Sequence, residues 1–244
     1  MKVAHYVIFG HPGLGDHILC NGIYRNIAQK AKKCFIATRK DNRYQIHEML
    51  SDLDNIKLLN YGNPVLFHSW TRKHIKYLRQ RESEGIKTLL LGDFGENFLA
   101  GARFDQSFYR QAEIDFQKRW DSFYAPRNKT KENRLFKKLV TSTKPIIFMH
   151  EDKSRGFSVN LELIDNINSF QIVRPLISKE FTIFDYRLIV ERATQVHCIE
   201  SSFAALIESM RIQGEKFAHR YARPEAKGDW RLEFTYKSDW KILM

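Results

Sequence analysis

Residues 3–18 read VAHYVIFGHPGLGDHI, and this stretch decides the fold. The apolar run Val3–Phe9 is typical of a buried strand, and it leads directly into a loop that holds three glycines and a proline. Such a loop lets the backbone turn sharply and approach a ligand, and the helix expected to begin near Asp16 offers N–H groups and a positive dipole end. The stretch predicts a ligand loop at the mouth of an α/β domain.

The order of residues in this loop excludes one common nucleotide-binding pattern and argues against another. A Walker loop needs Gly-Lys-Ser/Thr before its helix, but Gly15 is followed by Asp16 and His17. A dinucleotide fingerprint needs G-x-G-x-x-G and an acidic residue about twenty positions later. Here the glycines run G-x-x-G-x-G, and the second strand-like run, 34–38, ends in Arg39-Lys40. The loop therefore argues against Walker-type ATP hydrolysis and against NAD or methyl-donor binding.

Asp16 is the distinctive side chain of the loop. It stands beside Gly13 and Gly15, which leave room for a ligand next to its carboxylate. Two interpretations are open from the residues alone: Asp16 is a reacting group, or it caps the N-terminus of the helix.

Strand-like and helix-like segments alternate along the first part of the chain, which predicts a parallel sheet covered on both faces. Prolines at 126 and 145 bracket a short charged helix, 132–139, that we read as a bridge, and a second α/β unit begins at Pro145. We expect domains at 1–140 and 141–222. The segment 223–244 is rich in large apolar side chains, so we expect it to pack back on the first domain.

The second unit repeats the pattern of a strand that ends in a polar loop. The run 146–149 leads into a loop with His150, Lys153 and Arg155. The run 195–199 leads into Glu200, Ser201 and Ser202 and then a helix. Ligands of open α/β sheets bind at such carboxyl ends, and serines at a helix start can hold a phosphate or simply cap the helix.

The net charge of +12 calls for an anionic ligand or partner. The densest basic segment, 70–81, has its apolar residues on one helical face, so its cations are read as a solvated outer face. Nucleic-acid binding is not favoured, because no motif of that kind stands out. A phosphate-bearing small molecule or an anionic acceptor near a membrane explains the same charge.

Composition points to a folded, cytoplasmic protein. No apolar run reaches the length of a membrane span, and the first residues lack the pattern of a signal peptide. The three cysteines, Cys20, Cys34 and Cys198, are expected to be buried thiols. The nine histidines lack metal-ligand spacing, so we expect no protein-held zinc.

Taken together, these motifs resemble those of GT-B-type glycosyltransferases, of the heptosyltransferase-like and fucosyltransferase-like kind. The stretch 13–18, GLGDHI, looks like the L-G-D loop of heptosyltransferase-type enzymes, and the stretch 198–206, CIESSFAAL, is similar to the motif that holds the donor diphosphate. The resemblance implies an α/β fold of two Rossmann-like domains with parallel sheets that face each other across a cleft. This sequence departs from the usual D-T/S-G-x-x-H donor signature, because it lacks the Gly and the His.

The resemblance also implies roles for particular residues. Asp16 takes the place of the catalytic base, within an acceptor loop that includes His11, Gly13, Gly15 and His17. The donor-binding residues would be His150, Lys153, Arg155, Glu200, Ser201 and Ser202. The expected partners are a nucleoside-diphosphate sugar and a glycan or other hydroxyl acceptor, with a peripheral membrane contact left open. Transfer with inversion needs one base and groups that stabilise the departing diphosphate, so we expect no cofactor and no metal.

Three other functions compete with this prediction. A nucleotide-sugar epimerase would need a further pair of proton-transfer groups, which His11 and His17 could supply. A nucleotide- or glycan-binding module without catalysis would suit the short chain. A basic RNA-binding protein would suit the charge, and a steep salt dependence of binding would reveal it.

Overall fold

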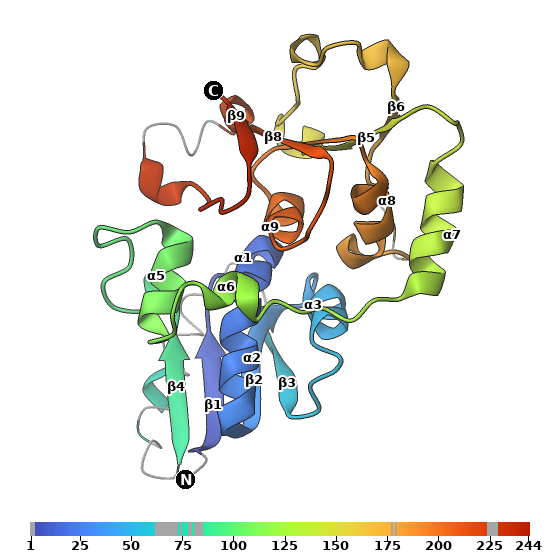
Figure 1. Cartoon of the computed structure of the whole chain (residues 1–244). Helices are drawn as coiled ribbons and strands as arrows, with labels where there is room; N and C mark the ends of the chain where they lie inside the picture. Colours follow the sequence, from blue (N-terminus) through green and yellow to red (C-terminus); the bar gives the residue numbers. More distant parts are fainter. Residues whose placement is uncertain are drawn as a thin grey trace. The chain divides into compact units, whose positions relative to one another are not determined.

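A computed structural model of the chain describes residues 3–61, 73, 75–77, 80, 85–176, 178, 180–223 and 229–244. The chain divides into two compact units, Met1–Pro126 and Arg127–Met244, each built on its own parallel sheet (Figure 1). The predicted α/β class with two parallel sheets is confirmed.

The first unit contains a four-stranded sheet in the order β3-β2-β1-β4. Its described elements are β1 (Val3–Phe9), α1 (Leu14–Leu19), α2 (Asn21–Lys30), β2 (Ala31–Arg39), α3 (Arg43–Met49), β3 (Ile56–Tyr61), β4 (Ile86–Leu90), η3 (Gly92–Phe94), α5 (Phe104–Gln111) and α6 (Lys118–Asp121). The chain first builds β2 and β3 on one side of β1 and then returns to add β4 on its other side. The strand order therefore reverses at β1, which creates a topological switch point.

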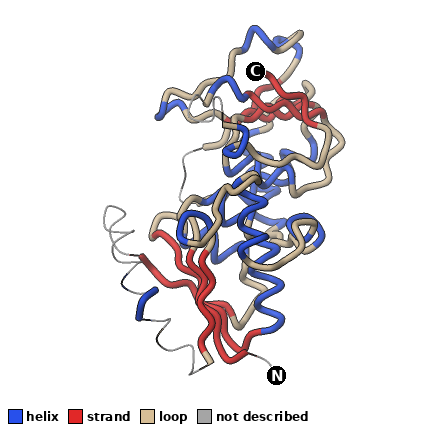
Figure 2. Tube along the Cα trace, turned by 90° about the vertical axis from the view of Figure 1, so that its left-hand side faces the viewer, coloured by secondary structure: helices blue, strands red, loops and turns tan. Residues whose placement is uncertain are grey.

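Both faces of the first sheet are covered. Val7 and Phe9 of β1 lie in a buried cluster with Ala37 and Ile75. The described residues 75–77 form a short helical piece on this face, whereas α2 covers the opposite face (Figure 2). Alternate residues of β1 are buried on both sides, as expected for a parallel strand.

The second unit contains a five-stranded sheet in the order β6-β5-β7-β8-β9. Its elements are α7 (Lys129–Leu139), β5 (Ile146–His150), η4 (Lys153–Arg155), η5 (Leu161–Leu163), η6 (Ile167–Ser169), β6 (Gln171–Val173), η7 (Ile183–Tyr186), α8 (Arg187–Arg192), β7 (Gln195–Cys198), α9 (Ser202–Glu208), β8 (Glu215–His219), η8 (Arg220–Ala222), η10 (Trp230–Leu232) and β9 (Trp240–Leu243). Neighbouring strands all run parallel, and the order reverses at β5.

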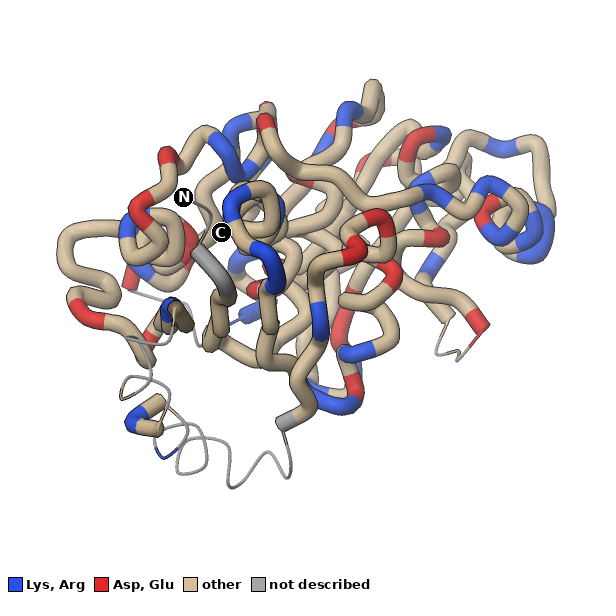
Figure 3. The backbone as a smooth tube through the Cα atoms, turned by 90° about the horizontal axis from the view of Figure 1, so that it is seen from below, with Lys and Arg blue, Asp and Glu red and all other residues tan. Residues whose placement is uncertain are grey.

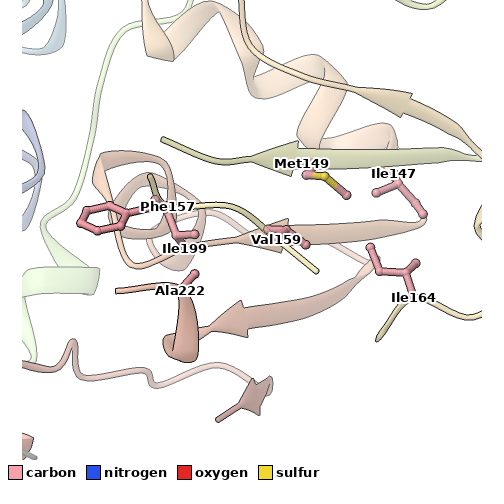
Figure 4. Close-up of a cluster of buried hydrophobic side chains, with 7 residues drawn as sticks. All are labelled: Ile147, Met149, Phe157, Val159, Ile164, Ile199 and Ala222. Atoms are coloured by element: carbon pink, nitrogen blue, oxygen red, sulfur yellow. The ribbon is translucent and has the colours of Figure 1, made fainter. Parts of the chain in front are cut away.

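A cluster of apolar side chains forms part of the core of the second unit, and it extends to the carboxyl ends of the strands (Figure 4). Ile147 and Met149 of β5 lie beside residues of the loops that follow β5 and β7. Phe157 lies at the end of the cluster toward which β5 points. The core thus supports the loop that carries the predicted donor residues.

The domain limits differ from those expected. The units meet at 126/127, and the charged helix that we read as a bridge belongs, as α7, to the second unit. Arg127 binds Glu132 of α7 and Glu191 of α8 with bidentate contacts. These buried and half-buried ion pairs hold α7 against the second sheet's helices.

The last strand of the segment 223–244 belongs to the second unit, and the packing of the segment on the first domain stays a prediction. This strand, β9, pairs with β8 at the edge of the second sheet. Glu208 of α9 anchors the segment, because its buried carboxylate accepts hydrogen bonds from the backbone N–H of Lys237 (2.7 Å) and the indole N–H of Trp240 (2.7 Å). A buried carboxylate needs such donors, and the segment supplies them.

All three cysteines are buried thiols, as predicted. Lys and Arg are interleaved with Asp and Glu along the trace of both units (Figure 3). Most of the basic segment 70–81 lies outside the described residues, so its predicted amphipathic helix is not described here. Among the described residues, no helix has the length and apolar character that a bilayer crossing requires.

Candidate functional site

In each sheet the strand order reverses between two neighbouring strands. The chain continues from one of them toward one edge of the sheet and from the other toward the opposite edge. We call this place the switch point. In the first unit these strands are β1 and β4, and Phe9 lies in register with Leu90. In the second unit they are β5 and β7, and His150 lies in register with Cys198. Ligands of open parallel sheets bind in the crevice at such carboxyl ends. The loops that follow these four strands are therefore the candidate site regions.

At the first switch point, the loop after β1 meets the loop after β4 through an imidazole and a carboxylate. Nε2 of His11 lies 2.9 Å from Oδ1 of Asp93. The backbone N–H of Asp93 donates a hydrogen bond to the same nitrogen at 3.3 Å. The side chains are 26% and 46% exposed, so both can be reached from solvent.

The structure around this pair fixes the imidazole ring. Gly92 has φ +71°, and a Cβ on it would lie 2.5 Å from the His11 ring, so only glycine leaves room there. The rings of Phe98 and Phe108 contact the imidazole edge to face, with centroids 5.3 and 5.5 Å away. The side chain of Gln111 accepts from Gly92 N–H at 2.7 Å and donates to its carbonyl at 2.9 Å. Both polar groups of the Gly92 backbone, its N–H and its carbonyl, are thereby hydrogen-bonded.

Asp16 lies in the first turn of α1, but it is not the N-cap residue. That position belongs to Gly13. The Asp16 carboxylate folds back over this glycine, because Oδ2 lies 2.5 Å from where a Cβ on Gly13 would be. The room that Gly13 provides is therefore used by Asp16 itself, next to the positive end of the helix dipole. Gly15 lies between them in the same turn.

His17, by contrast, points into the core. Its side chain is 1% exposed, and Nδ1 hydrogen-bonds the hydroxyl of Tyr24 at 2.8 Å. Burial lowers the pKa of His17 to about 3, so the ring is neutral. His17 is therefore a core residue that packs against α2. The sequence predicts it as a residue of the acceptor loop, and the structure corrects that prediction.

At the second switch point, His150 at the end of β5 meets Ser201 before α9. Nδ1 of His150 lies 2.9 Å from Oγ of Ser201. The imidazole also packs on the ring of Phe203, with centroids 4.7 Å apart, and burial lowers its pKa to about 4. Ser201 is the N-cap residue of α9, but its side chain makes no capping hydrogen bond. The hydroxyl is used for the contact with His150 instead.

The loop after β5 presents guanidinium and ammonium groups. Arg155 is 53% exposed and is oriented by Asp152, whose Oδ2 lies 2.6 Å from its Nε. Its guanidinium also lies over the ring of Phe157, 5.0 Å from the centroid. Arg223, which follows η8, lies over the same ring at 5.8 Å. Lys153 is exposed and lies 3.7 Å from Glu151. The buried ring of Phe157 thus brings two guanidinium groups from different loops to one place.

Glu200 is a buried residue that binds two arginine side chains. Its Oε1 accepts from Nε of Arg220 at 3.1 Å. Its backbone carbonyl accepts from Nη1 of Arg223 at 2.6 Å. Burial raises the pKa of the Glu200 carboxyl, an effect that Arg220 opposes. The residue therefore holds Arg220 and Arg223 near the strand ends, whereas the sequence predicts it as a ligand contact.

The comparisons with known proteins concern the fold. No family model matches the chain, and no curated protein sequence matches it. The structure is similar to that of a glycosyltransferase family 9 protein from Veillonella parvula DSM 2008, with a TM-score of 0.53 and 10% sequence identity over 100% of this chain and 87% of that one. It is also similar to E. coli ADP-heptose LPS heptosyltransferase II, with a TM-score of 0.52 and 9% identity over 88% and 84%. The chain has a GT-B-like fold.

Within this GT-B-like fold, the structure brings together some of the predicted residues and adds others. His150 and Ser201 are in contact, and Arg155 lies in the loop that follows His150. Ser202 begins α9 next to Ser201. Asp93, Arg220 and Arg223 were not predicted, because their place depends on which strands are neighbours. Among the described residues, no group of three or more His, Cys, Asp or Glu side chains suited to a metal ion is found.

Proposed function

We propose that this chain transfers a sugar from a nucleoside-diphosphate sugar to an acceptor hydroxyl. The observation that carries the proposal is the cationic switch point of the second unit within a GT-B-like fold. There the loops after β5 and β7 place Arg155 and Ser201 at neighbouring strand ends. The nucleoside diphosphate is the anionic part of the donor, and it departs as the leaving group when the sugar is transferred.

The donor side of the proposal rests on charge-assisted hydrogen bonds. A half-exposed guanidinium such as that of Arg155 can bind phosphate oxygens in a bidentate manner. Lys153 lies on the same turn, and the guanidinium of Arg223 lies 5.8 Å from the centroid of the Phe157 ring. Ser201 and Ser202 add hydroxyls from the start of α9. These groups would stabilise the negative charge that develops on the departing diphosphate.

The chemical step needs one proton acceptor and needs no covalent nucleophile. We therefore propose inversion at the transferred sugar without a metal ion. Asp16, the base that the sequence predicts, stays a candidate proton acceptor on the acceptor loop. Its test is Asp16→Asn, which keeps shape but removes the acceptor of the proton.

Two alternatives are less well supported. An epimerase that used His11 and His17 would need both imidazoles at the ligand, and the His17 side chain is buried against Tyr24. RNA binding would favour a continuous cationic surface, whereas the described cations alternate with carboxylates and many are in ion pairs.

The experiment that tests the proposal incubates the full chain with a panel of uridine, guanosine, adenosine and cytidine diphosphate sugars, with and without a panel of hydroxyl-bearing glycans. Mass spectrometry follows the released nucleoside diphosphate and any acceptor that gains one sugar. We expect both products with one donor. Donor binding without release would indicate a binding module, and an isomerised donor would indicate an epimerase. Either result would overturn the proposal.

A further inference from the structure

An open groove with a volume of about 500 Å³ lies beside β4 in the first unit, and we call it the β4 groove. Residues of β4 line it, together with the C-terminal ends of α2 and α5 and residues 95–97 of the loop after β4. Ile27, Leu89 and Ile114 give the groove an apolar lining. Its volume is within the range of about 300–1,000 Å³ that ligand sites occupy.

Glu113 lines the groove at the turn that ends α5. Its N–H donates to the carbonyl of Arg110, and the N–H of Ile114 donates to the carbonyl of Tyr109, both at 3.0 Å. These bonds form a Schellman turn, in which the residue after the helix cap adopts the left-handed conformation and is usually glycine. Glu113 adopts it with φ +54°. Glycine would make this turn with less strain, so the turn does not explain a glutamate here.

The loop after β4 forms another wall of the groove with a similarly unusual backbone. Asn97, which lines the groove, has φ +58°, and Leu99 has the same value. Arg110 donates to the carbonyl of Asn97, and Gln111 donates to the carbonyl of Glu96 at 3.0 Å. Such backbone conformations persist only where neighbouring groups hold them, and they gather at ligand-binding sites. The end of α5 therefore holds this wall in a fixed shape.

The lining of the groove carries charged groups of both signs. Lys30 and Lys87 are exposed, and so are Glu96 and Glu113. Within the described residues, none of these four side chains belongs to an ion pair. A ligand of one charge would be repelled by half of these groups. A hydroxyl both donates and accepts hydrogen bonds, so an uncharged ligand with many hydroxyls can use the ammonium groups and the carboxylates together.

We propose that the β4 groove binds an uncharged oligosaccharide. Glu96 and Glu113 accept hydrogen bonds from the sugar hydroxyls. Lys30 and Lys87 donate hydrogen bonds to other hydroxyls of the same chain. The apolar lining of the groove packs against the C–H faces of the sugar rings.

The position of the groove connects this ligand with the acceptor. The groove includes Leu90, the last residue of β4, and Gly95 of the loop that follows. An oligosaccharide in the groove therefore has one end at the carboxyl end of the sheet, where ligands of parallel sheets bind. This part of the inference rests on the proposed function: the groove holds those units of a glycan acceptor that do not react.

The first test measures binding without a donor. The full chain, labelled with nitrogen-15, is titrated with the neutral trisaccharides maltotriose, mannotriose, cellotriose and triacetylchitotriose, and with trigalacturonate and the chitosan trimer as charged counterparts. We expect a neutral trisaccharide to shift the amide signals of residues 86–90, 95–97 and 112–114, with a Kd of about 1 mM or lower. The inference is wrong if no neutral trisaccharide shifts these signals, or if a charged counterpart binds the groove more tightly.

Glu113→Gly is the sharpest variant, because glycine keeps the turn and removes the carboxylate. We expect the affinity for the trisaccharide to fall about tenfold, since a hydrogen bond to a charged group is lost. The urea midpoint of unfolding should stay the same or rise, because glycine relieves the strain of the turn. Lys87→Met keeps the apolar stem of the side chain and should lower the affinity about threefold to tenfold. Wild-type affinity in Glu113→Gly would overturn the inference.

Matched controls lie at the opposite edge of the same sheet. Asp54 precedes β3 and Lys57 lies within it, and both are exposed. Asp54→Asn and Lys57→Met should leave the affinity for the trisaccharide unchanged. A fall as large as that in the groove variants would mean that binding follows the charge of the whole chain, and the inference would be wrong.

Kinetics separates this inference from the proposed function. With the donor and acceptor that the panel identifies, Glu113→Gly should raise the KM for the acceptor about tenfold and leave kcat unchanged, because the groove binds units that do not react. If transfer occurs and this KM does not change, the inference is wrong and the proposed function stands. If the chain releases no nucleoside diphosphate but the trisaccharide binds the groove, the proposed function is wrong and the groove is still a glycan site.

Discussion

A histidine lies at each of the two switch points, and the surroundings of the two imidazole rings differ. His11 of the first unit lies beside a carboxylate and is partly exposed, whereas His150 of the second unit lies beside a hydroxyl and is largely buried. The charges around them also differ. The acidic residue Asp93 lies next to His11, whereas the basic residues Arg155 and Arg223 lie at Phe157, in the loop that follows His150. Two sheets with the same kind of strand reversal thus present different side chains, an imidazole and a carboxylate in one and guanidinium groups in the other.

The comparison also shows what the topology leaves open. A strand reversal fixes where a ligand can bind, but the side chains in the loops decide which one. In the first unit, glycine and aromatic residues hold one ring in place. In the second, a buried glutamate and a buried phenylalanine gather cations from separate loops. Each prediction below would break or sharpen this contrast.

The largest expected effect is on the acid stability of the second unit. Burial lowers the pKa of His150 to about 4, of His197 to about 3 and of His219 to about 4, from 6.5. The unfolded chain therefore binds more protons below pH 6.5, and stability falls as the pH falls toward these values. Each imidazole contributes up to about 1.4 kcal/mol per pH unit. Among the described histidines of the first unit, His17 is the one whose pKa burial lowers.

Thiol labelling under mild urea can separate the units, because Cys198 is buried in the second and Cys20 and Cys34 are buried in the first. With a disulfide reagent that reacts in acid, we expect Cys198 to become accessible at lower urea than the other two at pH 5. At pH 7.5 this difference should shrink. Equal sensitivity of all three thiols to pH would contradict the asymmetry.

The next effect concerns Glu208, which anchors the segment 223–244. Glu208→Ala removes the acceptor for Lys237, Ser238 and Trp240, so the free energy of unfolding should fall by about 3 kcal/mol. Urea unfolding followed by Cys198 labelling measures it. Glu215→Ala, which breaks only an exposed ion pair with Lys241, should change stability by less than about 0.5 kcal/mol. Equal losses in both variants would mean that Glu208 is not the anchor.

A smaller effect is expected on nucleotide binding. Arg155→Ala should weaken calorimetric affinity for a nucleoside diphosphate by about 1.5–3 kcal/mol, because a charge-assisted hydrogen bond is lost. Arg192→Ala removes an exposed arginine at the end of α8, away from the strand ends, and should change nothing. If Arg155→Ala binds every nucleoside diphosphate as the wild type does, the anion-binding half of the comparison fails.

The smallest effect separates capping from positioning at Ser201. Its hydroxyl contacts His150 and does not cap α9, so Ser201→Ala should cost only about 0.5–1.5 kcal/mol of stability. The variant should release the His150 ring, which NMR of its side-chain signals can follow. An unchanged His150 environment would show that the contact does not hold the ring.

Much of the fold follows from local sequence rules. The run 3–9 forms the predicted first strand with the predicted limits, because it is apolar and ends at a glycine. His150 and Ser201 could be placed near each other because parallel strands end at the same edge of their sheet. Lone acidic residues in apolar segments, such as Glu208 in FAALIES, also signal a buried hydrogen-bonded carboxylate.

The rest depends on strand order, which a single sequence does not encode locally. Asp93 stands in a stretch that reads only as a glycine- and phenylalanine-containing loop, and it meets His11 because β4 lies next to β1. Arg223 reaches Phe157 because β8 lies next to β7. His17 has one overlooked signal, Tyr24 two helical turns later, which is its buried partner.

The positive φ of Gly92 gives the contact between His11 and Asp93 a searchable signature. The histidine stands two residues after the first strand, and a Gly-Asp pair begins two residues after the strand on its other side. A distant homologue with this spacing should keep the glycine even where the surrounding loop has changed completely, because any β-carbon there would collide with the imidazole. A homologue that has lost the histidine is released from that constraint. Covariation of these two positions would therefore trace the His11–Gly92 contact through lineages in which overall similarity has faded.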